Sequence, residues 1–289
     1  MREVDPALLD HPARLAPVAV LDLEMTGLSP RTDRICEVAV VVGRGGVVEY
    51  EVHSLVKPSA PMTESALACH GLSESMLHDA PSFSEVAPRV ADALGGAAVV
   101  AHNVPFDLTF LQRELEDAGR GIGAPVTVDT LLMARRLFAF RKNNLPEVAD
   151  RLGIPMARSH RALDDARATF RVYTRMLEIL DPDGTLTIRE LNDLVDALAP
   201  NSPLRLQQKK VLRRAFRDRR TVWIDYQSTG DPAVGTLSRE VAIWFLRLPR
   251  IQGWCHMRTA ERVFRLDRMT RVSPGERSYE VPPDAVSRI

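Results

Sequence analysis

The sequence contains little cysteine and no long hydrophobic run. Its three cysteines, Cys36, Cys69 and Cys255, are odd in number and lack the spacing of metal ligands. This pattern indicates reduced thiols in a cytoplasmic protein rather than a disulfide framework. No apolar run approaches the length of a membrane span, and the acidic N-terminal segment lacks the layout of a signal peptide. We therefore expect a cytoplasmic protein without a membrane partner.

The chain also lacks a net charge, but its charges are unevenly distributed. Overall, 38 basic residues balance 38 acidic ones. Residues 200–289 hold 18 Lys and Arg against 9 Asp and Glu, which leaves 20 basic and 29 acidic residues in 1–199. Such asymmetry indicates that the C-terminal part contacts a polyanion. The alternative is a solvated basic surface without a ligand.

Strand and helix patterns alternate in the first part of the chain and give way to strands in the last. Apolar and β-branched runs predict strands at 18–23, 35–43, 47–56, 97–101, 126–128, 222–226, 240–246, 253–257 and 263–266. Helical periodicity predicts helices at 83–94, 105–118, 130–138, 145–152, 162–180, 187–198 and 206–220. We expect an α/β domain over 1–183 with its core at 17–180, a helical linker over 184–204, and a basic domain over 205–289.

Four acidic residues and one histidine stand where predicted strands end and helices begin. Asp22 and Glu24, two residues apart, point to one face at the end of the first strand. Asp107 lies in the first turn of the helix after the strand at 97–101. His160 and Asp165 flank the start of the helix at 162–180. Alone, each residue suits a solvated strand end or a helix cap.

Converging carboxylates repel one another and are costly to bury, so they need cations between them. Oxygen ligands favour Mg²⁺ or Mn²⁺ over zinc. Two such cations about 3.5–4 Å apart suit an in-line displacement at phosphorus. The histidine is then free to accept the proton of an attacking water. The residues therefore predict phosphate chemistry with two divalent cations.

The ordered motifs D-x-E, H-N-x-x-F-D and H-x-x-x-x-D resemble those of the DEDD-type 3′–5′ exonucleases that carry histidine in the last motif. The proofreading epsilon subunit of bacterial replicative polymerase is similar over residues 17–180. This resemblance implies an α/β, RNase H-like mixed sheet flanked by helices. It implies that Thr26 and Leu28 contact the 3′-terminal nucleotide and that His160 is the general base. The implied metal ligands are Asp22, Glu24, Asp107 and Asp165.

The first motif departs from the epsilon pattern at Met25, where threonine is usual, and D-L-E-M-T-G-L is also similar to the oligoribonucleases. We expect a 3′–5′ exonuclease that favours DNA and releases nucleoside 5′-monophosphates. An exoribonuclease acting on RNA ends or short oligoribonucleotides is an alternative. A non-catalytic, nucleic-acid-responsive regulator is a second alternative. Nucleic-acid 3′ ends, and replication or repair proteins, are the expected partners.

The segment from Leu206 onward is similar to WYL domains, which implies a small SH3-like β-barrel. The resemblance is carried by I-D-Y at 224–226, Arg239, Cys255-His256 and R-V-F-R-L-D-R at 262–268. Arginines beside aromatic residues suit phosphate contact and base stacking. We expect the domain to bind nucleic acid or a regulatory ligand, and the candidate contacts are Arg262, Arg265 and Arg268. The alternative for these arginines is ion pairing with Glu261 and Asp267.

Overall fold

The computed structural model describes residues 6–138, 140, 142–156, 160–227 and 236–289. The chain divides into two compact units, one formed by Met1–Leu132 with Lys142–Asn192 and the other by Met133–Arg141 with Asp193–Ile289. We refer to them as the N-terminal and C-terminal units. Their division falls inside helix α8 (Ile188–Ala197). The domain limits expected at 183 and 205 stay a prediction.

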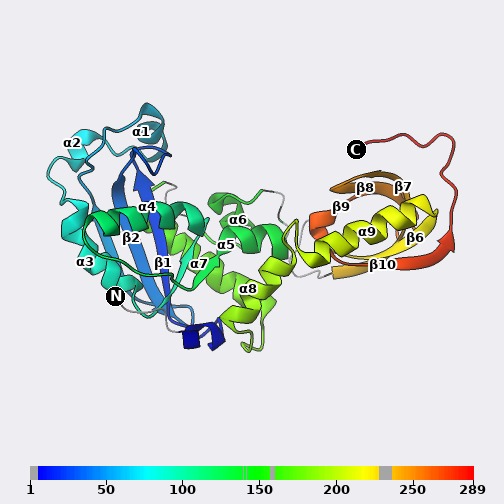
Figure 1. Ribbon diagram of the computed structural model, residues 1–289, viewed down its shortest axis with the longest axis horizontal. Coiled ribbons are helices and arrows are strands. Elements are labelled where there is room, and N and C mark those ends of the chain that lie inside the picture. Colours follow the sequence, from blue (N-terminus) through cyan, green and yellow to red (C-terminus); the bar gives the residue numbers. More distant parts are fainter. Residues whose placement is uncertain (1–5, 139, 141, 157–159, 228–235) are drawn as a thin grey trace. The chain divides into compact units, whose positions relative to one another are not determined.

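The N-terminal unit is built on a five-stranded mixed sheet with the strand order β3-β2-β1-β4-β5 (Figure 1). The strands are β1 (Val18–Met25), β2 (Ile35–Arg44), β3 (Val47–Leu55), β4 (Ala98–Ala101) and β5 (Thr127–Asp129). The first three strands pair antiparallel, whereas β4 runs parallel to β1 and β5 runs parallel to β4. The mixed sheet expected from the sequence is confirmed.

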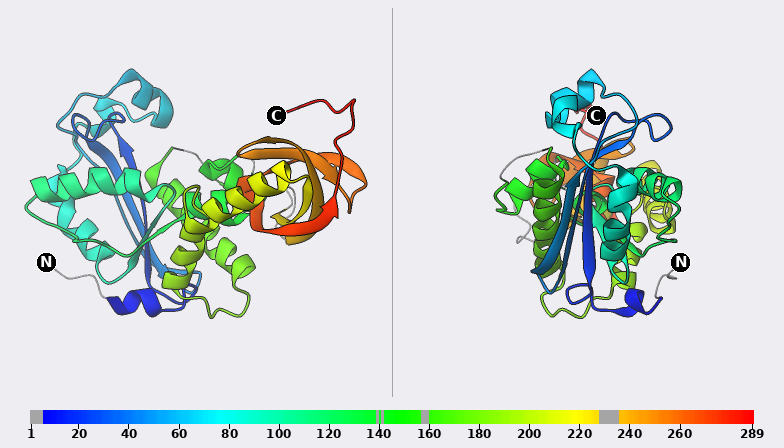
Figure 2. Two further views of the ribbon diagram at one scale, coloured as in Figure 1. Left: turned by 45° about the vertical axis from the view of Figure 1, so that its right-hand side comes forward. Right: turned by 90° about the vertical axis from the view of Figure 1, so that its left-hand side faces the viewer.

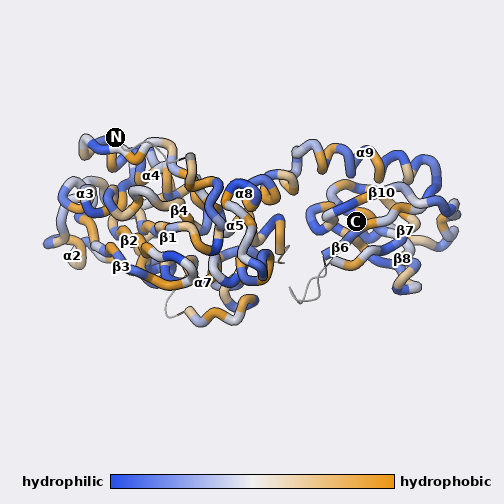
Figure 3. The backbone as a smooth tube through the Cα atoms, turned by 90° about the horizontal axis from the view of Figure 1, so that it is seen from below, coloured by the Kyte–Doolittle hydropathy of each residue, from blue (hydrophilic) through white to orange (hydrophobic). Residues whose placement is uncertain are grey.

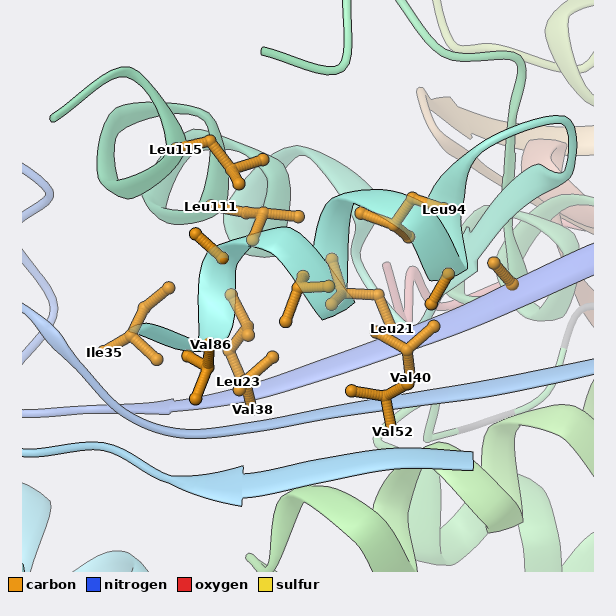
Figure 4. Packing of buried hydrophobic residues seen from close by; sticks show 14 of the residues in the cluster. Leu21, Leu23, Ile35, Val38, Val40, Val52, Val86, Leu94, Leu111 and Leu115 are labelled. Carbon is orange, nitrogen blue, oxygen red and sulfur yellow. The ribbon is translucent and has the colours of Figure 1, made fainter. Parts of the chain in front are cut away.

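Helices cover both faces of this sheet (Figure 2). Helix α7 (Ala162–Leu180) packs on β1 and β2, whereas α3 (Phe83–Leu94) and α4 (Val104–Asp117) pack on the opposite face. Central strands covered on both sides read as continuous apolar runs, and every residue of β2 except Arg44 is buried. Figure 4 shows the cluster under α3 and α4, where Leu21 and Val40 lie near Leu94. This rigid layer holds the carboxyl ends of β1 and β4 in place.

The remaining helical elements of the unit are short. They are η1 (Pro6–Asp10), α1 (Glu64–His70), α2 (Glu74–Leu77), α5 (Thr130–Met133) and α6 (Leu145–Arg151). The sequence patterns gave no prediction for α1 and α2, because neither is long enough to show a period. Their signal is the capping residue: Thr63 Oγ1 accepts from the Ala66 amide, and Ser73 Oγ accepts from the Met76 amide.

The C-terminal unit combines one long helix with an antiparallel five-stranded sheet of order β10-β6-β7-β8-β9. Its elements are α9 (Pro203–Arg217), β6 (Arg220–Gln227), β7 (Thr236–Arg247), β8 (Arg250–Cys255), β9 (Ala260–Arg265), η4 (Leu266–Arg268) and β10 (Met269–Ser278). The apolar face of α9 contributes Leu212 and Ala215 to the core, and hydrophilic residues fill much of the rest of the helix (Figure 3). A π-helical turn, η2 (Ala134–Phe138), belongs to this unit and replaces the end of the helix predicted at 130–138.

The C-terminal sheet includes one strand that the sequence patterns did not predict. Strand β10 was not predicted, because M-T-R-V-S-P-G-E-R-S is polar and contains proline and glycine; pairing with β6 forms it. The edge strands β9 and β10 do not pair with each other in the described residues, so barrel closure stays a prediction. Among the helices in the described ranges, none has the length and apolar character that crossing a bilayer requires.

Candidate active site

Strand β1 carries the first two acids of the predicted site. Asp22 lies opposite Ala39 of β2, and Glu24 lies opposite Glu37. The register shifts between Glu24 and Met25, so a β-bulge follows the second acid immediately. Glu24 is 9% exposed although it sits at a strand end. The strand thus presents two carboxylates on one face and holds one of them nearly out of water.

The third acid, Asp107, lies in the first turn of α4 and is 7% exposed. The helix is entered through Asn103, which has a left-handed backbone with φ of 98°. Asp129, at the end of β5, fixes this corner: its Oδ1 accepts from the amides of Asn103 (3.3 Å), Leu131 (2.9 Å) and Leu132 (3.1 Å). Asp129 therefore serves as a helix cap.

His160 and Asp165 meet at the start of α7. His160 has a φ of 62°, and its amide donates to Asp165 Oδ2 at 2.9 Å. Ligand atoms of Glu24, His160 and Asp165 all lie within 4.8 Å of one another. Asp165 Oδ1 is buried and has no hydrogen-bond partner among the described residues. The imidazole, which is exposed, therefore lies beside two carboxylates that come from distant segments of the chain.

The four carboxylates influence one another electrostatically. Burial, followed by repulsion from Asp107, Asp165 and Glu24, raises the pKa of Asp22 well above its usual range. Burial and repulsion from Asp165 raise the pKa of Glu24 to about 8. Burial also raises the pKa of Asp107 to about 8, although the amides of Asp107 and Leu23 oppose the shift. Burial likewise raises the pKa of Asp165, against hydrogen bonding from His160.

This donor set fits divalent cations. It supplies carboxylate oxygens, which hard cations such as Mg²⁺ and Mn²⁺ prefer. The buried, unpartnered Asp165 Oδ1 lacks the hydrogen bond that a buried carboxylate oxygen normally has, and a cation would satisfy it. Repulsion within the set adds to burial in raising the pKa of Asp22 and of Glu24, and bound cations would relieve that repulsion.

One acidic residue beside the site was not predicted from the sequence. Glu37 on β2 is fully buried, and burial by itself would raise its pKa. Hydrogen bonds from His53, Arg161 and the Ala162 amide outweigh burial and lower the pKa of Glu37 to about 2. A signal was available in I-C-E-V-A-V-V-V, where a lone acid interrupts an apolar strand.

The two residues expected to contact the 3′-terminal nucleotide differ in exposure. Thr26 is fully buried, its amide donates to the Arg34 carbonyl, and its Oγ1 accepts from the Arg34 amide at 3.1 Å. Its hydroxyl therefore holds the loop between β1 and β2. Leu28, in that loop, is 78% exposed and can reach a ligand.

The three predicted arginine contacts lie in the C-terminal unit and are in different environments. Arg262 is exposed on β9. Arg265 forms a two-point ion pair with Asp267, with N–O distances of 3.0 and 2.6 Å, as the pairing alternative expected. Strand β9 ends at Arg265, and Arg268 lies in the 3-10 turn that follows. Arg268 has a buried Nε with no partner among the described residues.

The acids and the histidine lie at one edge of a mixed sheet, at the end of β1 and at the starts of α4 and α7. Residues 19–173, more than half of the chain, match the family profile described as Exonuclease, RNase T. The chain belongs to the RNase T exonuclease family. Residues 208–274 match the WYL domain. The chain is thus an exonuclease-family hydrolase followed by a WYL domain.

Two curated relatives resemble the exonuclease part of the chain. A PolC-type DNA polymerase III from Thermotoga maritima is 35% identical over 209 residues, which are 70% of this chain and 15% of the polymerase. A DNA polymerase III subunit epsilon-like protein from Rhodobacter capsulatus is 37% identical over 187 residues, which are 63% of this chain and 26% of that protein. The chain thus spans a minor part of the length of both relatives.

A solved structure of exonuclease X in complex with 5′ overhanging duplex DNA has a similar fold. The TM-score is 0.50 at 24% sequence identity, and the match covers 62% of this chain and 99% of that one. At this level of identity the likeness concerns the fold. It is the RNase H-like α/β fold that the motifs predicted.

Proposed function

We propose that this protein is a 3′–5′ exonuclease that hydrolyses the terminal phosphodiester bond of nucleic acid, with DNA favoured, and releases nucleoside 5′-monophosphates. The observation that carries the proposal is the grouping of Glu24, Asp165 and His160 within 4.8 Å, beside a buried carboxylate oxygen that lacks a partner. Asp22 and Asp107 complete the acidic set through the repulsion that raises the pKa of Asp22. DNA as substrate is supported by the relatives, which are named as a DNA polymerase and as a protein similar to a DNA polymerase subunit.

Asp22, Glu24, Asp107 and Asp165 would hold two divalent cations, Mg²⁺ or Mn²⁺. When bound, such cations polarise the phosphoryl oxygens and offset the charge that develops on the attacking and leaving oxygens. The Cys36 thiol on β2 is not among these ligands, since it is buried and burial raises its pKa to about 12.

His160 would act as the general base. Its exposed ring can accept a proton from the water that attacks the terminal phosphorus, and its backbone is held by the Asp165 carboxylate. The P–O3′ bond then breaks, the 3′-oxygen leaves with the shortened strand, and the terminal nucleotide departs as a 5′-monophosphate. Leu28 would contact the terminal base, and Thr26 would hold the loop that presents it.

Product analysis tests this proposal directly. Single- and double-stranded DNA and RNA, labelled at the 3′ or the 5′ end, are incubated with the protein and Mn²⁺. We expect 5′-monophosphates to be released from 3′ ends, faster from DNA than from matched RNA, and Asp22→Asn to reduce the rate to background. Asp79→Asn, a change of an acid with a 98% exposed side chain, is the control and should not alter the rate. Equal rates for Asp22→Asn and the wild type would refute the site, and a faster rate on RNA would favour the exoribonuclease.

We further propose that residues 205–289 form an SH3-like WYL domain, joined to the exonuclease domain (1–183) by a helical linker at 184–204, and that this domain binds nucleic acid or a regulatory ligand. Arg239 is 8% exposed, and its Nε lacks a partner among the described residues. His256 Nε2 and Arg268 Nε are also buried atoms that lack a hydrogen-bond partner among the described residues. Buried donors without acceptors are unfavourable, and an anion would satisfy them. Replication or repair proteins would be partners in the cytoplasm.

Binding of a fluorescent oligonucleotide, measured over a range of salt concentrations, tests this role. Arg239→Gln and Arg268→Gln should weaken binding, and the salt dependence should flatten as phosphate contacts are lost. Arg217→Gln, which changes an exposed arginine paired with Asp218, is the matched control. Unchanged affinity in both test variants would rule out nucleic acid as the ligand of this domain.

A further inference from the structure

Both carboxylate oxygens of Glu37 are extensively hydrogen-bonded. Its Oε1 lies 2.8 Å from His53 Nε2 and 2.9 Å from Arg161 Nη2. Its Oε2 accepts from Arg161 Nε at 3.2 Å and from the Ala162 amide at 3.1 Å. The side chain is fully buried on β2, opposite Glu24. Glu37, whose carboxylate contributes no ligand atom to the Glu24–His160–Asp165 group, is therefore anchored beside that group.

These contacts fix the start of α7. The first amides of a helix have no partner within the helix and need an outside acceptor. Arg161, the residue before α7, makes no capping hydrogen bond with its own side chain. Glu37, which is distant in sequence, supplies the acceptor for the Ala162 amide instead. The helix that carries Asp165 is thus capped from the central sheet.

The same contacts restrain His160. Its left-handed backbone, with φ of 62°, is sparsely populated by residues other than glycine and persists only where the surroundings enforce it. On its C-terminal side, Arg161 is fixed by a planar two-point pairing, which determines orientation as well as distance. The His160 amide is fixed by Asp165. The imidazole therefore projects from a backbone that is held at two adjacent points.

We propose that Glu37 and Arg161 are positioning residues, which set the placement of His160 and Asp165 for the hydrolysis without contacting the substrate. The inference rests on the proposed exonuclease function. It differs from a purely structural role, because a residue that only stabilises the fold affects the folded fraction and not the turnover of folded molecules.

The experiment compares kcat and KM for Glu37→Gln, Arg161→Lys and the double variant with those of the wild type, in Mn²⁺ and over a range of 3′-labelled DNA concentrations up to saturation. Glutamine keeps the shape of Glu37 but offers one acceptor oxygen instead of two. We expect kcat to fall about 10- to 100-fold for Glu37→Gln, as for other groups that orient metal-site ligands, with KM within about 2-fold. Lysine keeps the charge but not the two-point pairing, so Arg161→Lys should retain more activity than Glu37→Gln.

The double variant tests whether the two residues act as one unit. If they do, its loss in kcat should not exceed that of Glu37→Gln alone, because a shared contact can be lost only once. If the fold-losses in kcat of the two single variants multiply in the double variant, the two residues do not act as one unit. Glu51→Gln is the matched control: Glu51 on β3 also forms a two-point pair with an α7 arginine, Arg167, at 2.7 and 2.6 Å, but it does not cap the helix. Its kcat should equal that of the wild type.

Two outcomes are separable. A wild-type protein without exonuclease activity refutes the proposed function itself. An active wild type with Glu37→Gln and Arg161→Lys both equal to Glu51→Gln overturns the positioning role. Assays well below the unfolding midpoint of each variant exclude a folding effect, and a kcat loss that vanishes there also overturns it. Should Glu37→Gln not fold, the comparison of Arg161→Lys with Arg167→Lys decides the question in the same way.

Discussion

The acidic set of the N-terminal unit and Arg205 of the C-terminal unit differ in how their buried charge is balanced. In the N-terminal unit, four acids converge, none of them forms an ion pair with a lysine or arginine among the described residues, and burial raises the pKa of each. In the C-terminal unit, Arg205 is 2% exposed, and its guanidinium donates to the carbonyls of Leu198, Leu266, Asp267 and Met269. One arrangement leaves charge unsatisfied, and the other satisfies it with backbone oxygens.

This difference indicates which buried charged groups can bind a ligand and which only stabilise the fold. A buried charge that is fully hydrogen-bonded by its own chain has no capacity left for a ligand, so Arg205 fixes α9 to the turn at η4 and to β10. A buried charge without such partners lowers stability unless a ligand completes it. The acidic set is therefore the candidate for catalysis. Arg239, His256 and Arg268, with their unpartnered nitrogens, are the candidates for binding.

The largest expected effect concerns turnover. His160→Gln should lower kcat by about 10²- to 10⁴-fold, the usual contribution of a general base, while the unfolding midpoint stays close to that of the wild type. His78→Gln, which changes an exposed histidine paired with Asp79, is the control and should be fully active. The rate of 5′-monophosphate release is the measurement. A fully active His160→Gln variant would remove the general base from the mechanism.

The next effect concerns stability of the C-terminal unit. Arg205→Ala leaves several buried carbonyls without donors and should lower the free energy of unfolding of this unit by about 3 kcal/mol. All three tryptophans of the chain, Trp223, Trp244 and Trp254, lie in the C-terminal unit, so tryptophan fluorescence in urea reports on it alone. Arg214→Ala, at a side chain that is 81% exposed, should have little effect. Equal midpoints for the two variants would contradict the architectural role.

A third effect concerns pH and metal. The folded-state pKa values of Glu24 and Asp107 are raised to about 8 from their ordinary values of 4.5 and 3.8. The folded state therefore binds more protons between those values, and the stability that protonation contributes is lost as the pH rises toward 8. In EDTA, the thermal midpoint of the N-terminal unit, followed by circular dichroism, should fall across this range. Mn²⁺ should raise it more at about pH 8 than at about pH 5, because fewer protons must be displaced.

The double variant Glu24→Gln/Asp107→Asn is the control for that measurement, and its midpoint should depend less on pH. Tryptophan fluorescence of the C-terminal unit should show no matching response to Mn²⁺. A response to Mn²⁺ of equal size in both units would contradict a metal site confined to the N-terminal unit.

The smallest effect distinguishes two arginines on β9. Arg262→Ala should reduce the salt slope of oligonucleotide binding by about 1, as expected for a single phosphate contact. Arg265→Ala should change it less, because Asp267 already neutralises this guanidinium. Fluorescence anisotropy from low to moderate salt measures both. A larger change for Arg265→Ala would mean that the pair with Asp267 opens on binding.

Much of the N-terminal unit could be predicted, because its determinants are local. The apolar runs of β1 and β2 show up directly in a sequence, and the spacing of Asp22 and Glu24 places both on one face of a strand. The short helices α1 and α2, strand β10 and the turn at η4 were not predicted. The two helices are specified by their caps and β10 by its pairing with β6, rather than by a repeating pattern.

The sequence by itself determined the kinds of groups at the site, since only a few residue types supply metal ligands or a base near neutral pH. The tertiary structure decided which buried charged groups find hydrogen-bond partners within the chain and which do not. Glu37 and Arg161 are 124 positions apart, and nothing local indicates that one anchors the other. Likewise, the fully bonded Arg205 and the incompletely bonded Arg239 are the same residue type in the sequence. Burial and hydrogen bonding across distant segments made four acids the catalytic candidate and Glu37 a support for it.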